Sequence, residues 1–145
     1  MKLKQMIVDA DICIKIGLSE KYLFVEKLFP CIAEKIYIHK VVFDEIKVPA
    51  CAKQQLEHLI ELGIVEMVSE SNLSDVEQVL YHAIYDNLAD VMVNKSKPNK
   101  NKGEISSLAM AKITNIPIFA TDEKDLQPII NEKLNTGIFL AGFEK

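Results

Sequence analysis

Two carboxylates stand one residue apart directly after an apolar run near the start of the chain. The run at 6–8 leads into Asp9 and Asp11. Side chains alternate between the two faces of an extended backbone, so Asp9 and Asp11 point to the same side. Two like charges at that spacing repel each other, which a cation between them would relieve. The pair therefore predicts either a cation site or a carboxylate that caps a following helix.

Further acids fall where strands are expected to end or helices to begin, namely Glu45, Glu104, Asp122 and Asp125. The carboxyl ends of parallel strands meet at one edge of a sheet, so these acids are expected to share a pocket. Such a cluster suits hard divalent cations, which prefer oxygen ligands. Two ions about 3.5–4 Å apart would activate a water and stabilise the leaving oxygen in phosphodiester hydrolysis. No serine, cysteine or histidine stands in an obvious place for a nucleophile, so metal-bound water is the expected one.

Short apolar runs alternate with helical patterns along the chain. Strands are expected at 5–9, 35–39, 64–69, 116–120 and 137–141. Helical stretches are expected at 12–29, 40–47, 49–62, 71–93 (as one helix, or as two divided at Asn87), 104–115 and 123–134. This alternation predicts an α/β fold, a three-layer α/β/α sandwich around a central parallel sheet. The length predicts one domain over 1–145.

Composition narrows the classes of function. The net charge of −4 argues against a protein that coats nucleic acid, and all 17 basic residues are lysine, so phosphates would meet ammonium groups or backbone N–H. The three cysteines are odd in number and widely spaced, which argues against a disulfide framework or a zinc ribbon. The three histidines are expected at the surface or half-buried. No apolar run reaches the length of a membrane span, and Asp9 and Asp11 interrupt any signal-peptide core, so a cytoplasmic protein is expected.

Three segments in this order resemble the PIN-domain ribonucleases, a family that includes many bacterial toxin nucleases and RNA-processing enzymes. They are "VDADICIKIG" at 8–17, "VVFDEI" at 41–46 and "KGEISSLAMAKITNIPIFATDEKDL" at 102–126. The last segment is the most specific, with an acid, a helix of small residues, an apolar strand and then Thr-Asp. The resemblance implies a PIN-like fold and hydrolysis of RNA with Mg²⁺ or Mn²⁺ as cofactor.

Residue by residue, the resemblance implies that the catalytic acids are Asp9, Glu45, Glu104 and Asp122. It implies that the metal ligands are Asp9, Glu104, Asp122 and Asp125. Thr121 and Asp11 are candidate partners that orient these ligands. The family usually has Asn, Ser or Thr where this chain has Asp11, so Asp11 adds negative charge, and its role as ligand, helix cap or outer partner stays open. Whether Glu45 or its neighbour Asp44 faces the pocket also stays open.

The polar loop 94–103 precedes Glu104 and carries four lysines, which are Lys95, Lys97, Lys100 and Lys102. They either keep the loop solvated or contact RNA phosphates beside the metal. The resemblance further implies an antitoxin protein as partner, if the chain is a toxin. It also implies a homodimer, for which the apolar stripe at 76–92 is a candidate surface.

Three other interpretations compete with the nuclease. Asp9-Ala10-Asp11 also matches a phosphatase of the haloacid-dehalogenase type, with Asp9 as nucleophile and Asp11 as general acid and base. A non-catalytic PIN-like module would keep the fold and bind a protein or RNA without an ion. Finally, several acids could simply cap helices, with Asp11 before Ile12, Glu104 in a first turn, and Asp122 with Asp125 as a capping box.

Overall fold

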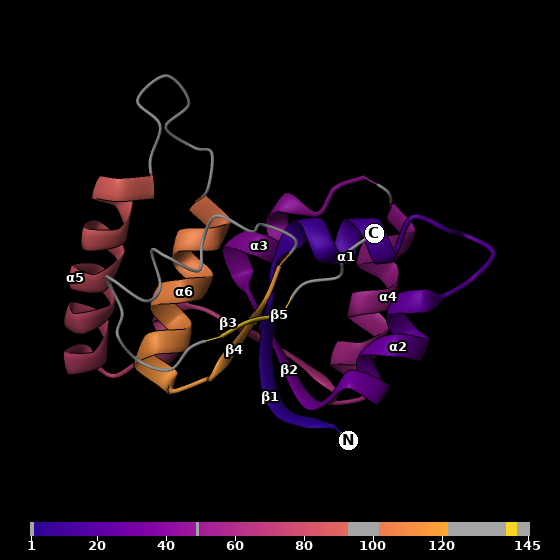
Figure 1. Ribbon diagram of the computed structural model, residues 1–145, viewed down its shortest axis with the longest axis horizontal. Coiled ribbons are helices and arrows are strands. Elements are labelled where there is room, and N and C mark those ends of the chain that lie inside the picture. Colours follow the sequence, from indigo (N-terminus) through magenta and orange to yellow (C-terminus); the bar gives the residue numbers. More distant parts are fainter. Residues whose placement is uncertain (1, 49, 93–101, 122–138, 142–145) are drawn as a thin grey trace.

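The protein forms a parallel α/β sandwich. The computed structural model describes residues 2–48, 50–92, 102–121 and 139–141, and in this part the strands form one parallel sheet of order β3-β2-β1-β4-β5 (Figure 1). The strands are β1 (Leu3–Val8), β2 (Ala33–His39), β3 (Val65–Val68), β4 (Ile118–Ala120) and β5 (Phe139–Ala141). The predicted strands differ from these by no more than two residues at either end. The predicted fold class is confirmed.

Helices cover both faces of the sheet. They are α1 (Ala10–Ile16), α2 (Phe24–Ile32), α3 (Lys40–Glu45), α4 (Ala50–Glu61), α5 (Asp75–Met92) and α6 (Lys102–Thr114), with a short 3₁₀ helix at Glu70–Asn72. Figure 1 shows α5 and α6 on one side of the sheet and α1, α2 and α4 on the other. Three layers follow from this arrangement.

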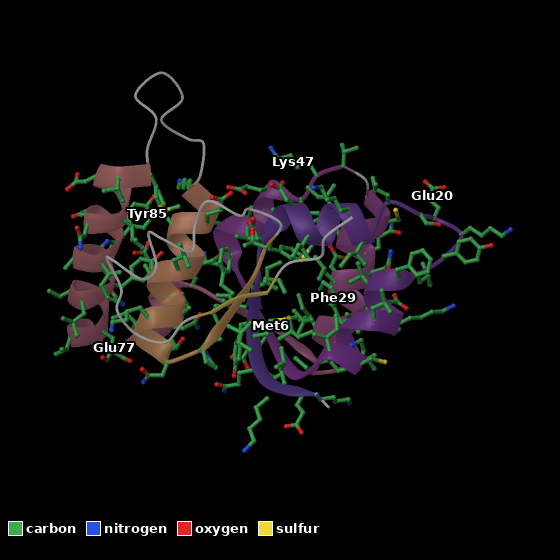
Figure 2. The ribbon with its side chains drawn as sticks, in the orientation of Figure 1. Met6, Glu20, Phe29, Lys47, Glu77 and Tyr85 are labelled. Atoms are coloured by element: carbon green, nitrogen blue, oxygen red, sulfur yellow. The ribbon has the colours of Figure 1, made fainter. Side chains whose placement is uncertain are left out.

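The alternation of side chains along β1 builds a separate core on each face. Met6 and Val8 belong to the core that contains Phe29 of α2, whereas Ile7 belongs to the core beneath α5 and α6. Met6 and Phe29 lie on the α2 side of the sheet in Figure 2. A strand covered on both faces must be apolar at successive positions, which explains the continuous apolar run that ends at Asp9.

The helices differ from the sequence predictions in one place and decide between two alternatives in another. The stretch 12–29 is two helices rather than one: α1 ends before Gly17, whose N–H still donates to Cys13 O at 2.9 Å, and α2 begins at Phe24. The helix α5 runs without a break through Asn87, which is exposed and makes no demand on packing. Pro49 and most of the predicted loop 94–103 and all of the predicted helix 123–134 lie outside the described residues.

Gly17 allows α1 to approach α4 closely. A Cβ at Gly17 would lie 2.5 Å from Ala52 Cβ and 2.8 Å from Ala52 Cα. Because one neighbour is backbone, the overlap cannot be relieved by rotating a side chain. We expect Gly17→Ala to lower the free energy of unfolding by about 1–3 kcal/mol, as overpacking usually does. Urea unfolding of Gly17→Ala, Ala52→Gly and the double variant measures this, and strictly additive effects would contradict the proposed clash.

Candidate metal centre

The site lies at the point where the order of strands reverses. The chain passes from β1 outward to β2 and β3, then returns to the other side of β1 with β4 and β5. In open parallel sheets the crevice at this reversal, outside the carboxyl ends of the strands, is the usual place for ligands. Asp9 directly follows β1, and Thr121 directly follows β4.

Asp9 is fixed from both sides of this crevice. It is 3% exposed, and its backbone N–H donates to Ala120 O at 3.0 Å. Its Oδ1 accepts from Ala10 N–H at 2.8 Å at the start of α1. Its Oδ2 accepts from Thr121 Oγ1 at 3.1 Å, across the β1–β4 junction. Asp9 is therefore both the N-cap of α1 and a preorganised carboxylate at the reversal point.

The surroundings of Asp9 disfavour its negative charge. The pKa of Asp9 is raised from 3.8 to about 7, mainly by burial and to a smaller extent by the nearby carboxylates Asp11 and Glu45. The N–H of Ala10 and the hydroxyl of Thr121 only partly offset this rise. A bound cation would supply the positive charge that the site lacks.

Three carboxylates converge at this point. One oxygen each from Asp9, Asp11 and Glu104 lies within 4.8 Å of the other two. Glu104 is 9% exposed in the first turn of α6, and Asp11 is exposed in the first turn of α1. Oxygens at this separation can be bridged by one ion with ligand distances of about 2.0–2.6 Å. The all-oxygen donor set fits Mg²⁺ or Mn²⁺.

Glu45 lies beside this group and not within it. It ends α3, and its carboxylate accepts from the backbone N–H of Gly103. A Cβ at Gly103 would lie only 2.7 Å from Glu45 Oε2, so glycine is what allows this approach. Burial raises the pKa of Glu45, the Gly103 N–H and Lys102 lower it, and the charge of Asp11 raises it.

The side chain of the neighbouring acid, Asp44, points away from the cluster. Its carboxylate pairs with Lys40 at 3.7 Å on the exposed side of α3. Of the two acids considered for this position, Glu45 is therefore the one that faces the cluster.

The structure describes part of the predicted site. Asp9, Asp11, Glu104, Glu45 and Thr121 meet around the crevice. The predicted ligands Asp122 and Asp125 lie outside the described residues, as do the predicted RNA contacts Lys95, Lys97 and Lys100. Lys102 is described and is the exposed first residue of α6, close enough to act on Glu45 through its charge.

One buried polar group was missed at the sequence level. His39 is 3% exposed, so its predicted place at the surface or half-buried is wrong. Its Nδ1 accepts from Val41 N–H at 3.0 Å, and its Nε2 lies 3.1 Å from the Tyr81 hydroxyl. The position at the end of an apolar strand was a signal for burial, but the partner is 42 residues away on α5.

Comparison of the chain with protein-family models and with curated proteins gave no match. Among the described residues, no helix is long and apolar enough to cross a membrane. The fold and the site by themselves define a class: a parallel α/β sandwich with an acidic cluster at the reversal point of its sheet.

Proposed function

We propose that this protein is a metal-dependent nuclease of the PIN type that hydrolyses phosphodiester bonds in RNA. The observation that carries the proposal is the convergence of Asp9, Asp11 and Glu104 within 4.8 Å at the reversal point of the sheet. Helix capping explains why a carboxylate lies at the start of its own helix. It does not explain why Asp9, at the start of α1, and Glu104, in α6, converge on one point. Three acids held together favour a function that uses a cation.

In this proposal Asp9 and Glu104 hold a Mg²⁺ or Mn²⁺ ion, with Asp122 and Asp125 as further ligands implied by the sequence resemblance. When bound, the ion supplies an activated water and stabilises charge on the phosphate oxygens. Thr121 Oγ1 keeps Asp9 Oδ2 oriented by its 3.1 Å hydrogen bond. Asp11 adds charge on the exposed side and recruits the cation.

Glu45 is proposed to receive a proton from the attacking water. Its pKa is raised by burial, and a carboxylate with a raised pKa is a better proton acceptor than an ordinary one. The Gly103 N–H holds that carboxylate in place. Lys102, at the exposed start of α6, is proposed to contact a phosphate of the RNA together with Lys95, Lys97 and Lys100.

Two partners belong to this proposal. A toxin nuclease would have an antitoxin protein as its inhibitor. A homodimer would use the outer face of α5, where Val76 and Val79 are 70% exposed and Leu80 is 51% exposed. The inner face of the same helix is occupied by buried Tyr81, Leu88 and Met92. The apolar stripe at 76–92 thus divides between the core and the surface.

The phosphatase alternative is less favoured by the geometry. A nucleophilic carboxylate must let the phosphorus atom of a substrate reach one of its oxygens, whereas Asp9 is 3% exposed. A metal ion is much smaller, and each oxygen of Asp9 keeps a lone pair for it after accepting one hydrogen bond. Phosphate released from a monoester substrate, with an aspartyl-phosphate trapped on Asp9, would favour it over the nuclease.

The test is cleavage of a panel of RNA and single-stranded DNA oligonucleotides with Mg²⁺, Mn²⁺ or EDTA. We expect metal-dependent cleavage of RNA and a large loss of rate in Glu45→Gln. Asp44→Asn is the matched control, because it neutralises the adjacent acid that points away from the cluster. Absence of cleavage with every metal, in folded protein that does not bind Mn²⁺, would favour a binding module instead.

A further inference from the structure

Three buried polar side chains connect the helices that carry Glu45 and Glu104. His39, Tyr81 and Ser106 are each no more than 3% exposed. His39 Nε2 lies 3.1 Å from the Tyr81 hydroxyl, which also hydrogen-bonds to the side chain of Ser106. The three residues come from β2, α5 and α6. We refer to them as the His39–Tyr81–Ser106 network.

The protonation of His39 follows from its hydrogen bond to the backbone of Val41. Val41 N–H donates to His39 Nδ1 at 3.0 Å, so Nδ1 carries no proton and the neutral ring is protonated at Nε2. Nε2–H then donates to the Tyr81 oxygen, and Tyr81 makes its second hydrogen bond with Ser106. Burial lowers the pKa of His39 to about 4 and raises the pKa of Tyr81 to about 12. Both groups are therefore neutral at neutral pH.

At one end, the network fixes the start of α3. His39 is the N-cap of this six-residue helix, and Glu45 is the last residue of the helix. A helix this short has little stability of its own, so its orientation depends on the contacts at its ends. These contacts are the His39 cap at the start and the Gly103 N–H, which binds Glu45, at the end.

At the other end, the network fixes the rotation of α6. Ser106 lies two residues after Glu104, and side chains two apart on an α-helix point about 200° apart. Holding Ser106 toward α5 therefore keeps Glu104 on the opposite face, toward Asp9. Tyr85 of α5 also hydrogen-bonds to Ser106, whereas the hydrogen bond to His39 is made by Tyr81.

We propose that Tyr81 is a positioning residue of the acidic cluster, whose hydroxyl sets the placement of Glu45 relative to Glu104 through His39 on one side and Ser106 on the other. The consequence for metal binding rests on the proposed function. The structural link between α3 and α6 does not.

The first test uses the metal-free protein. Tyr81→Phe removes the hydroxyl and keeps the ring. Because α3 then loses a tie to α6, we expect exchange of the Gly103 amide proton to quicken by about five- to tenfold, the change expected for loss of one buried hydrogen bond. Tyr85→Phe is the matched control, since it also removes a hydroxyl bound to Ser106, and it should change this exchange by less than about twofold. The measurement is amide hydrogen exchange by NMR.

The second test measures Mn²⁺ affinity in the same variants. We expect Tyr81→Phe to weaken Mn²⁺ binding by about tenfold, as loss of a group that orients metal ligands does. His39→Asn keeps an acceptor for Val41 N–H but is too short to reach Tyr81, so it should weaken binding similarly. The double variant should be no weaker than either single one, because all three break the same connection.

The outcomes separate this inference from the proposed function. Unchanged Gly103 exchange in Tyr81→Phe, or equal effects of Tyr81→Phe and Tyr85→Phe, would overturn the positioning role. Faster Gly103 exchange in Tyr81→Phe, together with a wild-type protein that binds no Mn²⁺, would support the link between α3 and α6 and reject the metal-dependent function.

Discussion

Asp9→Asn is expected to reduce metal-dependent RNA cleavage by at least about 10²-fold while the protein stays folded. Asparagine keeps the local hydrogen bonds: its Oδ1 can accept from Ala10 N–H, and its Nδ2–H can donate to Thr121 Oγ1. What it removes is the negative charge at the centre of the cluster. Initial rates of cleavage in Mg²⁺ measure the loss, and thermal unfolding followed by circular dichroism verifies the fold.

The control for this prediction is again Asp44→Asn, which makes the same chemical change on the exposed side of α3. It should cleave at the wild-type rate. A rate for Asp9→Asn within about twofold of the wild type would remove Asp9 from the mechanism and with it the proposed metal centre.

The second large effect concerns the stability of the metal-free protein as pH changes. Burial places the pKa of Asp9 at about 7 in the folded state, above its ordinary value of 3.8. Between these values the folded state binds more protons than the unfolded state, so the free energy of unfolding falls as pH rises. The contribution of Asp9 is complete below about pH 4 and is lost by about pH 8, a change on the order of 3–4 kcal/mol.

Asp9→Asn isolates this contribution because it cannot ionise. In urea unfolding without metal, we expect the variant to gain stability relative to the wild type as pH rises from about 5 to about 8. Parallel pH curves for the two proteins would show that burial does not hold the Asp9 proton in the folded state.

Bound Mg²⁺ should counter the loss of stability at high pH in the wild type but not in Asp9→Asn. Binding requires the deprotonated carboxylate, so affinity for Mg²⁺ should increase with pH through about 7. At a concentration about 100 times Kd, Mg²⁺ should stabilise the wild type by about 2.7 kcal/mol. Asp9→Asn should gain much less. Equal stabilisation of both proteins by Mg²⁺ would place the ion elsewhere.

The local features of this fold could be predicted from sequence because they depend on local patterns. The apolar run before Asp9 predicted a buried strand, and the small residues after Glu104 predicted a helix packed closely on the sheet, which is buried over 103–111. The close approach of α1 to α4 at Gly17 could not be predicted in the same way. It depends on Ala52, which is distant in sequence and meets Gly17 only in the packed fold.

The candidate site likewise has features that are visible in the sequence and features that depend on the packed fold. That Asp9 ends a strand is visible in the sequence, but its hydrogen bond to Thr121 spans 112 residues and depends on β1 and β4 being neighbours. From the sequence, Glu45 is predicted to be one of the catalytic acids, and the role of Asp11 is left open. The structure groups Asp11 with Asp9 and Glu104, and it places Glu45 against Gly103, because the order of strands and the rotation of α6 decide which oxygens meet.

The central claim is that Asp9, Asp11 and Glu104 form a site for a divalent cation. Titration of the protein with Mn²⁺, followed by the electron paramagnetic resonance signal of the free ion, tests it most directly. The wild type should deplete free Mn²⁺, Asp9→Asn and Glu104→Gln should bind it at least about tenfold more weakly, and Asp44→Asn should bind it like the wild type. No depletion by the wild type, or equal binding by all four proteins, would contradict the claim.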